Sequence, residues 1–316
     1  MSPNPARAVV LGMALAATIA LAACGSNAAS NAPTNPPTTV GRPSTSALPG
    51  TSAAPTTASA PTSAAPAQGQ VLSVTTMDNM FMGPSSLPAG LTTVQLHNQG
   101  PAPHQLQLLR LRDGVSADQA MAAAKTGNPG ALLSLATVAG GPNAVAAGHD
   151  QQVTVDLLAG TYLEVCFVPD PDGVSHVAKG MVSVLTVSGA PQPAEPPTPI
   201  ATAKLSDFKF ALPTPFNGHG TLQVINNGPQ PHELTILALA PGKGVDDALA
   251  FFGEATHTGP PPFSDAGGLG AIGAGQTAWV DLDLAPGDYA AVCLVPDPAT
   301  GKPHLMLGMS AGFTVS

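Results

Sequence analysis

The sequence predicts an all-β protein with two tandem Greek-key β-sandwich domains, each carrying one short helical insert. Three observations favour this fold class. A long segment of the chain is repeated, short β-rich runs alternate with turns, and glycine and proline number 34 and 35 while only 4% of the residues are aromatic. Many short strands separated by turn residues are typical of sandwiches and barrels.

The repeat is visible as two pairs of matching segments. Residues 98–104 read NQGPAPH, and residues 226–232 read NNGPQPH. Residues 160–171 read GTYLEVCFVPDP, and residues 287–298 read GDYAAVCLVPDP. Self-similarity of this kind indicates a duplicated structural unit.

Each copy predicts a similar series of strands and one helix. The helix is predicted from an alanine-rich stretch, residues 116–126 in the first copy and residues 244–252 in the second. In the first copy the expected strands are residues 71–76, 91–98, 104–111, 152–158, 162–168 and 181–187. In the second copy they are residues 221–226, 232–239, 277–284, 289–295 and 309–315.

The two tyrosines of the chain occupy matching places in the repeat. Tyr162 lies four residues before Cys166, and Tyr289 lies four residues before Cys293. The placement just after a glycine turn resembles the tyrosine corner of Greek-key sandwiches. It therefore favours a Greek-key connection in each copy.

The N-terminus is typical of an exported bacterial lipoprotein. Arg7 precedes an apolar stretch, residues 8–23, which is too short to span a bilayer. The motif Leu21-Ala22-Ala23-Cys24 predicts cleavage before Cys24 and lipidation of its thiol. We therefore expect a protein anchored in the membrane at the extracytoplasmic face of the cell envelope.

Composition divides the rest of the chain. Residues 24–69 are almost entirely Ser, Thr, Ala, Pro, Gly and Asn, which predicts a disordered tether. Residues 190–199 contain five prolines and predict a stiff linker. The predicted organisation is a signal peptide over 1–23, the tether, a first domain over 70–189, the linker and a second domain over 200–316.

The charge balance argues against nucleic acid as a partner. Lysine and arginine together number 10, and the net charge is −9. A protein that binds a phosphate backbone needs a basic surface to neutralise it.

Each copy repeats four residues with metal-binding side chains in the same order. A histidine follows a proline at the start of a strand, a cysteine ends a later strand, and a second histidine and a methionine follow in a loop. Two imidazoles, one thiolate and a weak axial thioether are the ligands of a type 1 copper site. The candidate ligands are His104, Cys166, His176 and Met181 in the first copy, and His232, Cys293, His304 and Met309 in the second.

This pattern resembles the cupredoxin family, the plastocyanin-like type 1 copper domains. The resemblance covers nearly all of the chain outside the N-terminal region and the linker. It implies one copper ion per domain, electron transfer, and an exposed loop histidine as the site where electrons enter. Asn98 and Asn226, six residues before the first histidine of each copy, are candidates for a hydrogen bond that braces the ligand loop. The cysteine-to-histidine loops have nine and ten intervening residues, closer to nitrite-reductase-like type 1 sites than to plastocyanin-like carriers.

Other interpretations of these residues stay open. The same ligands suit a copper buffer or chaperone that passes ions on, or a zinc site. Cys166 and Cys293 are also candidates for a disulfide, which would leave a metal-free β-sandwich binding module. Multicopper oxidases and copper nitrite reductases need additional histidines, and the chain has no His-X-His pair, so enzymatic activity is not expected. The redox partner, or the copper donor and acceptor, is not identified by the sequence.

Overall fold

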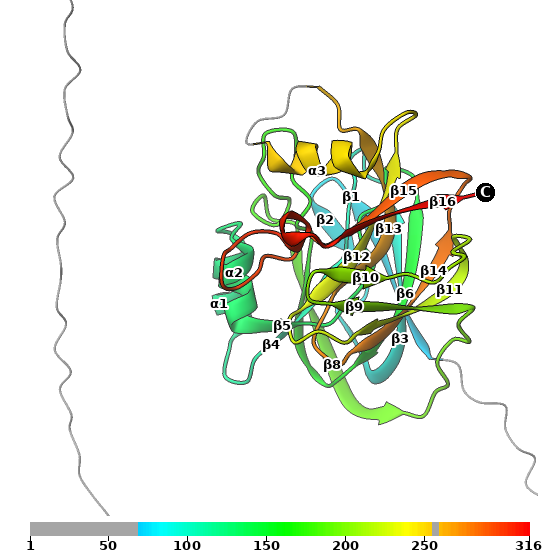
Figure 1. Ribbon diagram of the computed structural model, residues 1–316. Helices are drawn as coiled ribbons and strands as arrows, with labels where there is room; N and C mark the ends of the chain where they lie inside the picture. Colours follow the sequence, from blue (N-terminus) through cyan, green and yellow to red (C-terminus); the bar gives the residue numbers. More distant parts are fainter. Residues whose placement is uncertain (1–68, 255–258) are drawn as a thin grey trace, which may run out of the picture. The chain divides into compact units, whose positions relative to one another are not determined.

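Alternation between buried and exposed side chains accounts for the strands in the computed structural model, which describes residues 69–254 and 259–316 (Figure 1). In strand β3, Ser86–Asn98, the side chains of Val94, Leu96 and Asn98 are buried while those between them are partly exposed. Period-two alternation places one face of such a strand on the core and the other toward solvent. The predicted all-β fold is therefore confirmed.

The elements of the first copy follow the predicted series with additions. They are β1 Gln70–Met77, β2 Met80–Met82, β3 Ser86–Asn98, β4 Gln107–Leu111, α1 Ala117–Ala124, α2 Pro129–Leu135, β5 Ala136–Val138, β6 Asp150–Leu157, β7 Gly160–Val165 and β8 Val182–Gln192.

The second copy has the same order of strands, with one helix in place of two. Its elements are β9 Ala201–Ser206, β10 Lys209–Ala211, β11 His219–Asn226, β12 His232–Leu239, α3 Val245–Gly253, β13 Phe263–Ile272, β14 Thr277–Asp283, β15 Gly287–Val292, the short 3₁₀ helix η1 His304–Leu307 and β16 Ser310–Val315.

Strand pairing follows one scheme in both copies. β1 pairs with β3 in parallel, as β9 pairs with β11. β7 lies between β4 and β8, as β15 lies between β12 and β16. The two tyrosine hydroxyls also match: Tyr162 donates to the carbonyl of Leu158 and Tyr289 to that of Ala285, each at 2.7 Å. These are the contacts of a tyrosine corner.

Strands of the two copies also join each other. β14 pairs antiparallel with β6, so one sheet runs through strands of both copies, while β13, β12, β15 and β16 form a separate sheet. Strand β8 extends to Gln192, which lies inside the predicted linker of residues 190–199. The division of the chain at that linker stays a prediction.

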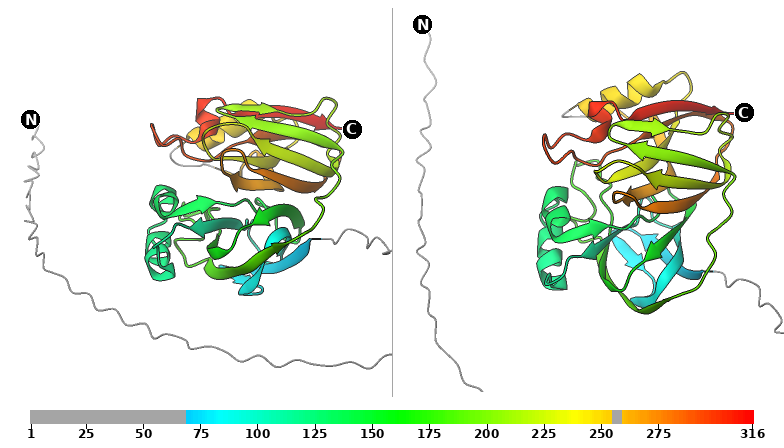
Figure 2. Two further views of the ribbon diagram at one scale, coloured as in Figure 1. Left: turned by 90° about the horizontal axis from the view of Figure 1, so that it is seen from below. Right: turned by 60° about the horizontal axis from the view of Figure 1, so that its bottom comes forward.

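The helical inserts lie where the alanine-rich stretches predicted them. Helix α1 begins at a capping box, in which the Ser116 hydroxyl accepts from the Gln119 backbone N–H at 3.2 Å and the Gln119 side chain accepts from Ser116 N–H at 2.9 Å. The first copy contains a second helix, α2, which was not predicted from the sequence. The α1 and α2 helices pack together at one end of the first copy (Figure 2).

Several predictions concern residues outside the described part of the chain. These are the signal peptide, the tether up to residue 68 and the lipidation of Cys24. In the described residues, no helix combines the length and the apolar character that crossing a membrane requires.

Candidate metal centre

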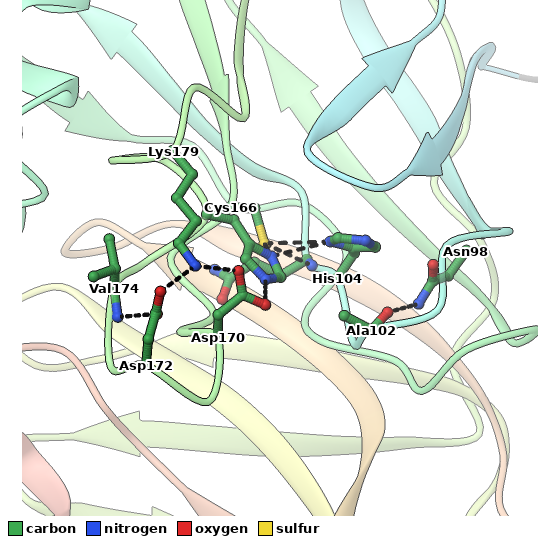
Figure 3. Close-up of polar contacts among 10 residues, drawn as sticks. Asn98, Ala102, His104, Cys166, Asp170, Asp172, Val174 and Lys179 are labelled. Atoms are coloured by element: carbon green, nitrogen blue, oxygen red, sulfur yellow. Dashed lines mark hydrogen bonds and ion pairs between the residues drawn. The ribbon is translucent and has the colours of Figure 1, made fainter.

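The first cluster brings together three of the predicted ligands of the first copy. His104 Nδ1 lies 3.1 Å from His176 Nδ1, and Cys166 Sγ lies 3.4 Å from His176 Nδ1 and 4.0 Å from His104 Nδ1 (Figure 3). All three side chains are buried, with at most 1% of each exposed. Two imidazole nitrogens and one sulfur therefore converge on a single point inside the protein.

Backbone hydrogen bonds hold each of these residues in place. His104 forms a bridge with Val145, in which each backbone N–H donates to the other's carbonyl. Cys166 lies directly after β7, and its carbonyl accepts from Val177 N–H at 2.8 Å. The loop after the cysteine is thus folded back so that His176 faces the sulfur.

The second cluster has the same inner geometry. His232 Nδ1 lies 3.0 Å from His304 Nδ1, and Cys293 Sγ lies 3.4 Å from His304 Nδ1. None of the three side chains is exposed to solvent. Within the described residues, these two clusters are the groups of three or more His, Cys, Asp or Glu that lie close enough to hold a metal ion.

The two predicted methionine ligands lie in matching positions beside the clusters. Met181 and Met309 are fully buried. The backbone N–H of Met181 donates to the carbonyl of His176 at 2.8 Å, and that of Met309 donates to His304 at 3.0 Å. Their backbones therefore adjoin the second histidine of each copy, and their role as axial ligands stays a prediction.

Each cysteine sulfur accepts hydrogen bonds from the backbone, one of them from the residue after the first histidine. The N–H of Gln105 lies 3.5 Å from Cys166 Sγ, and the N–H of Glu233 lies 3.5 Å from Cys293 Sγ. Burial raises the pKa of Cys166 to about 12 and raises the pKa of Cys293 as well. A buried thiolate without a neighbouring cation is unfavourable, and a bound metal ion supplies that positive charge.

Burial favours the neutral form of three of the clustered histidines, His104, His232 and His304. Burial, with a smaller contribution from His176, lowers the pKa of His104 to about 4. Burial also lowers the pKa of His232 and of His304. Neutral imidazoles carry the lone pair that a metal ion needs.

This donor set fits copper, with one ion in each copy. Copper in both oxidation states accepts a soft thiolate together with imidazoles, whereas Mg²⁺ and Ca²⁺ prefer oxygen ligands. The facing Nδ1 atoms at 3.0–3.1 Å are the atoms that a shared ion would hold together.

Asn98 and Asn226 make equivalent contacts in the two copies. Asn98 Oδ1 accepts from Gly100 N–H at 3.0 Å, and its Nδ2 donates to the carbonyls of Ala102 and Val145. Asn226 likewise accepts from the N–H of Gly228, and its Nδ2 donates to the carbonyls of Gln230 and Ile272. These contacts tie the loop before each first histidine to the strands beside it.

The outer nitrogens of the histidines differ between the copies, and the sequence reading missed their partners. In the first copy, His176 Nε2 lies 3.2 Å from Asp170 Oδ1, while His104 Nε2 is buried without a hydrogen-bond partner. In the second copy, His232 Nε2 lies 2.8 Å from Asp207 Oδ1, and His304 Nε2 lies 3.1 Å from Gln230 Oε1. Asp170 lies in the repeated motif VPDP, which was a signal available in the sequence.

One expectation and one alternative from the sequence are wrong. The loop histidines are not exposed, since only 1% of His176 and 0% of His304 is accessible, and their outer nitrogens contact Asp170 and Gln230. Cys166 and Cys293 do not form a disulfide, because each is free and faces its own pair of histidines.

Comparison with known proteins identifies no family from sequence. No family model matches the chain. No curated protein matches it either.

Similar folds are found among solved structures. Dithionite-reduced auracyanin from the photosynthetic bacterium Roseiflexus castenholzii is 20% identical, with 39% of this chain and all of that chain covered and a TM-score of 0.27. Auracyanin B is 26% identical over 40% of this chain and 94% of that chain, with a TM-score of 0.27. Copper nitrite reductase from Nitrosomonas europaea is 16% identical over 78% and 93%, with a TM-score of 0.23. At TM-scores this low, the functional interpretation rests on the two clusters themselves.

Proposed function

We propose that this protein is an electron carrier that holds one type 1 copper ion in each copy and is anchored to the outside of the cell envelope through Cys24. The observation that supports it is the convergence of two histidine Nδ1 atoms and one cysteine Sγ at two matching buried places. When bound there, copper would supply a one-electron couple between Cu(I) and Cu(II).

The chain's own residues would do the rest of the work. In this proposal, the cysteine thiolate and the two imidazoles form the plane of each site, and Met181 and Met309 provide the weak axial thioethers. Burial of all these side chains excludes water from the site. A rigid, dry ligand set changes little between oxidation states, and this favours fast electron transfer.

The thiolate absorption of the full-length chain tests this function. Titration with Cu(II) should produce an intense visible absorption that saturates at two equivalents. Cys166→Ser and Cys293→Ser should each remove about half of it, since each thiolate serves its own site. The double variant should have none. An absorption that persists in the double variant would reject the assignment.

A copper buffer or chaperone is the second candidate. The near-complete burial of His176 and His304 favours it, because neither imidazole edge reaches the surface as an electron entry site. A reversible one-electron couple with slow copper exchange supports the carrier. Rapid release of Cu(I) to a competing chelator, without a reversible couple, supports the buffer.

The anchor is tested separately from the metal sites. Cys24→Ser should move the protein from the membrane fraction to the soluble fraction while leaving the copper absorption unchanged. Retention in the membrane fraction would contradict lipidation at this residue.

A further inference from the structure

Three of the nine methionines of the chain gather on one short hairpin outside both clusters. Met77 ends β1, and Met80 and Met82 begin and end β2. Their side chains are 38%, 54% and 41% exposed. They contribute little to the core.

Strand register places the three side chains on one face of the hairpin. Met77 lies directly opposite Met80, and Thr75 lies directly opposite Met82. Directly opposite residues in an antiparallel pair point to the same side, with Cβ atoms about 4.5–5.5 Å apart. Met80 and Met82 share that side because they are two residues apart. Long, flexible methionine side chains at this spacing allow three sulfur atoms to meet above the sheet.

The equivalent hairpin of the second copy shows that the fold does not require these methionines. β9 and β10 pair in the same way, with Ser206 opposite Lys209 and Lys204 opposite Ala211. Ser206, Lys209 and Ala211 therefore occupy the positions of Met77, Met80 and Met82. The hairpin forms equally well with a hydroxyl, an amine and a methyl group on this face.

The turn of the methionine hairpin lies next to the first metal cluster. The backbone N–H of Gln99 donates to the carbonyl of Thr76 at 3.0 Å. A side-chain carbon placed on Gly100 would lie 2.7 Å from His104 Nε2 and 3.2 Å from the backbone nitrogen of Asp78, between Met77 and Met80. The absent side chain of Gly100 therefore leaves room between this turn and the His104 ring, which lie close together.

We propose that Met77, Met80 and Met82 form a surface binding site for Cu(I), separate from the two buried clusters. Thioethers are soft, uncharged ligands, so they select Cu(I) over Cu(II), Zn²⁺ and the alkaline-earth ions. Three of them on one exposed face offer a monovalent ion a site that it can enter and leave directly from solvent. The neighbouring buried cluster, which also contains sulfur, favours copper as the occupant over an apolar protein partner.

Cu(I) titration of the full-length chain under anaerobic conditions tests this site. With a chromophoric competitor as the probe of free Cu(I), the wild-type protein should bind one equivalent more than the variant Met77→Leu/Met80→Leu/Met82→Leu. Leucine preserves the apolar surface and removes only the sulfur. Equal stoichiometry for the two proteins would overturn the proposal. It would indicate that the methionines form an apolar docking patch instead.

Carbon-13 spectra of the methionine methyl groups locate the ion. Addition of Cu(I) should shift the three methyl signals that the leucine variants assign to the hairpin, in addition to any shift of Met181 and Met309 at the buried clusters. Met306 is a matched control, because it is 47% exposed but does not belong to the hairpin. A shift of Met306 without the three hairpin signals would contradict the site.

A Cys166→Ser/Cys293→Ser background separates this site from the buried clusters. The three methyl shifts should persist in that background even if the buried clusters bind no copper. The reciprocal variant Ser206→Met/Lys209→Met/Ala211→Met should gain one equivalent on the second hairpin. A folded variant that gains none would show that strand register alone does not create the site.

Discussion

The two clusters arrange their Nδ1 and Sγ atoms alike, but the partners of the outer histidine nitrogens differ between the copies. Their Nδ1 to Nδ1 distances are 3.1 and 3.0 Å, and both Sγ to Nδ1 distances for the loop histidine are 3.4 Å. In the second copy both outer nitrogens have partners, whereas in the first copy the outer nitrogen of His104 has none. The ligands are thus alike in the two copies, while the residues that contact their outer nitrogens differ.

The supports of the second cluster form a connected network. Gln230, which accepts from His304, also donates to Asp207 at 3.3 Å and to Asp297 at 3.2 Å. Asp207 in turn holds His232. In the first cluster the corresponding support is an ion pair near the surface, with Lys179 2.6 Å from Asp170. A histidine ligand whose outer nitrogen has a hydrogen-bond partner is fixed in orientation and binds metal more tightly. We therefore expect the second copy to bind copper with higher affinity.

The neighbours of the two sulfurs differ in charge. Gln105 and Glu233 occupy matching positions and donate a backbone N–H to the sulfur of their own copy. The Glu233 carboxylate also accepts from the N–H of Leu294 at 2.7 Å, and burial raises the pKa of Glu233 to about 7. The residue that donates its backbone N–H to the sulfur is thus acidic in the second copy and uncharged in the first, whereas the acidic groups that act on Cys166 are Asp265 and Asp170. The two sites are therefore expected to differ in reduction potential.

Removal of one ligand should have the largest effect and should separate the two copies. His104→Gly should abolish the copper absorption of the first copy, and His232→Gly that of the second, because a trigonal site loses one of its three strong ligands. Copper analysis of each purified variant should give one ion in place of two. Loss of both ions from either single variant would show that the sites are not independent.

The two copies should contribute differently to the pH dependence of the metal-free protein. Because burial lowers the pKa of His104 from 6.5 to about 4, the unfolded chain takes up a proton in this window that the folded chain does not. His104 should therefore lower the free energy of unfolding as the pH falls from about 6.5 to about 4, by at most about 3 kcal/mol, while the raised pKa of Glu233 acts in the opposite direction. Asp207 opposes the effect of burial at His232.

Chemical denaturation at about pH 7.5 and about pH 4.5 measures this difference. His104→Gln should change the pH dependence more than His232→Gln. Equal changes in the two variants would contradict the difference between the two histidines.

Loss of the support behind His232 should weaken copper binding in the second copy alone. Asp207→Asn removes the carboxylate charge 2.8 Å from His232 Nε2 and should lower the copper affinity of that site roughly 10–100-fold. Asp78 occupies the matching turn position in the first copy and makes no side-chain hydrogen bond to His104, whose Nε2 has no partner. Asp78→Asn is therefore the matched control, and competition titrations should show little change for it.

The surface ion pair of the first copy should matter least. Lys179→Met removes the pairs with Asp170 and Asp172, which are partly exposed, and should change the free energy of unfolding by about 0–1 kcal/mol. Thermal denaturation in low and high salt should show that this small difference shrinks as salt is added. A destabilisation that salt does not reduce would mean that Lys179 contributes by packing.

The ligand pattern was predictable because it consists of characteristic residue types in a fixed order, and because both copies contain it. His104, Cys166 and His176 could be proposed together although they come from distant parts of the chain, because the second copy repeats their order. The main strands were predictable from their alternation. Helix α2 also carries a local signal, since Asn128 caps it and Pro129 occupies its first turn.

Other features have no local signal. The β13 strand includes Gly267 and Gly268, both with positive φ, and a glycine-rich segment does not show a strand pattern. The contact of Asp207 with His232 joins residues 25 positions apart, and the pairing of β6 with β14 joins the two copies. The outer nitrogens of the loop histidines contact Asp170 and Gln230, and the spacing of the ligands does not reveal these contacts.

Anomalous diffraction at the copper absorption edge, from crystals of the copper-loaded protein, tests the central claim most directly. It should show two strong peaks of similar height, one among His104 Nδ1, His176 Nδ1 and Cys166 Sγ, and the other among the matching atoms of the second copy. A single peak, or copper bound away from both cysteine sulfurs, would contradict the account.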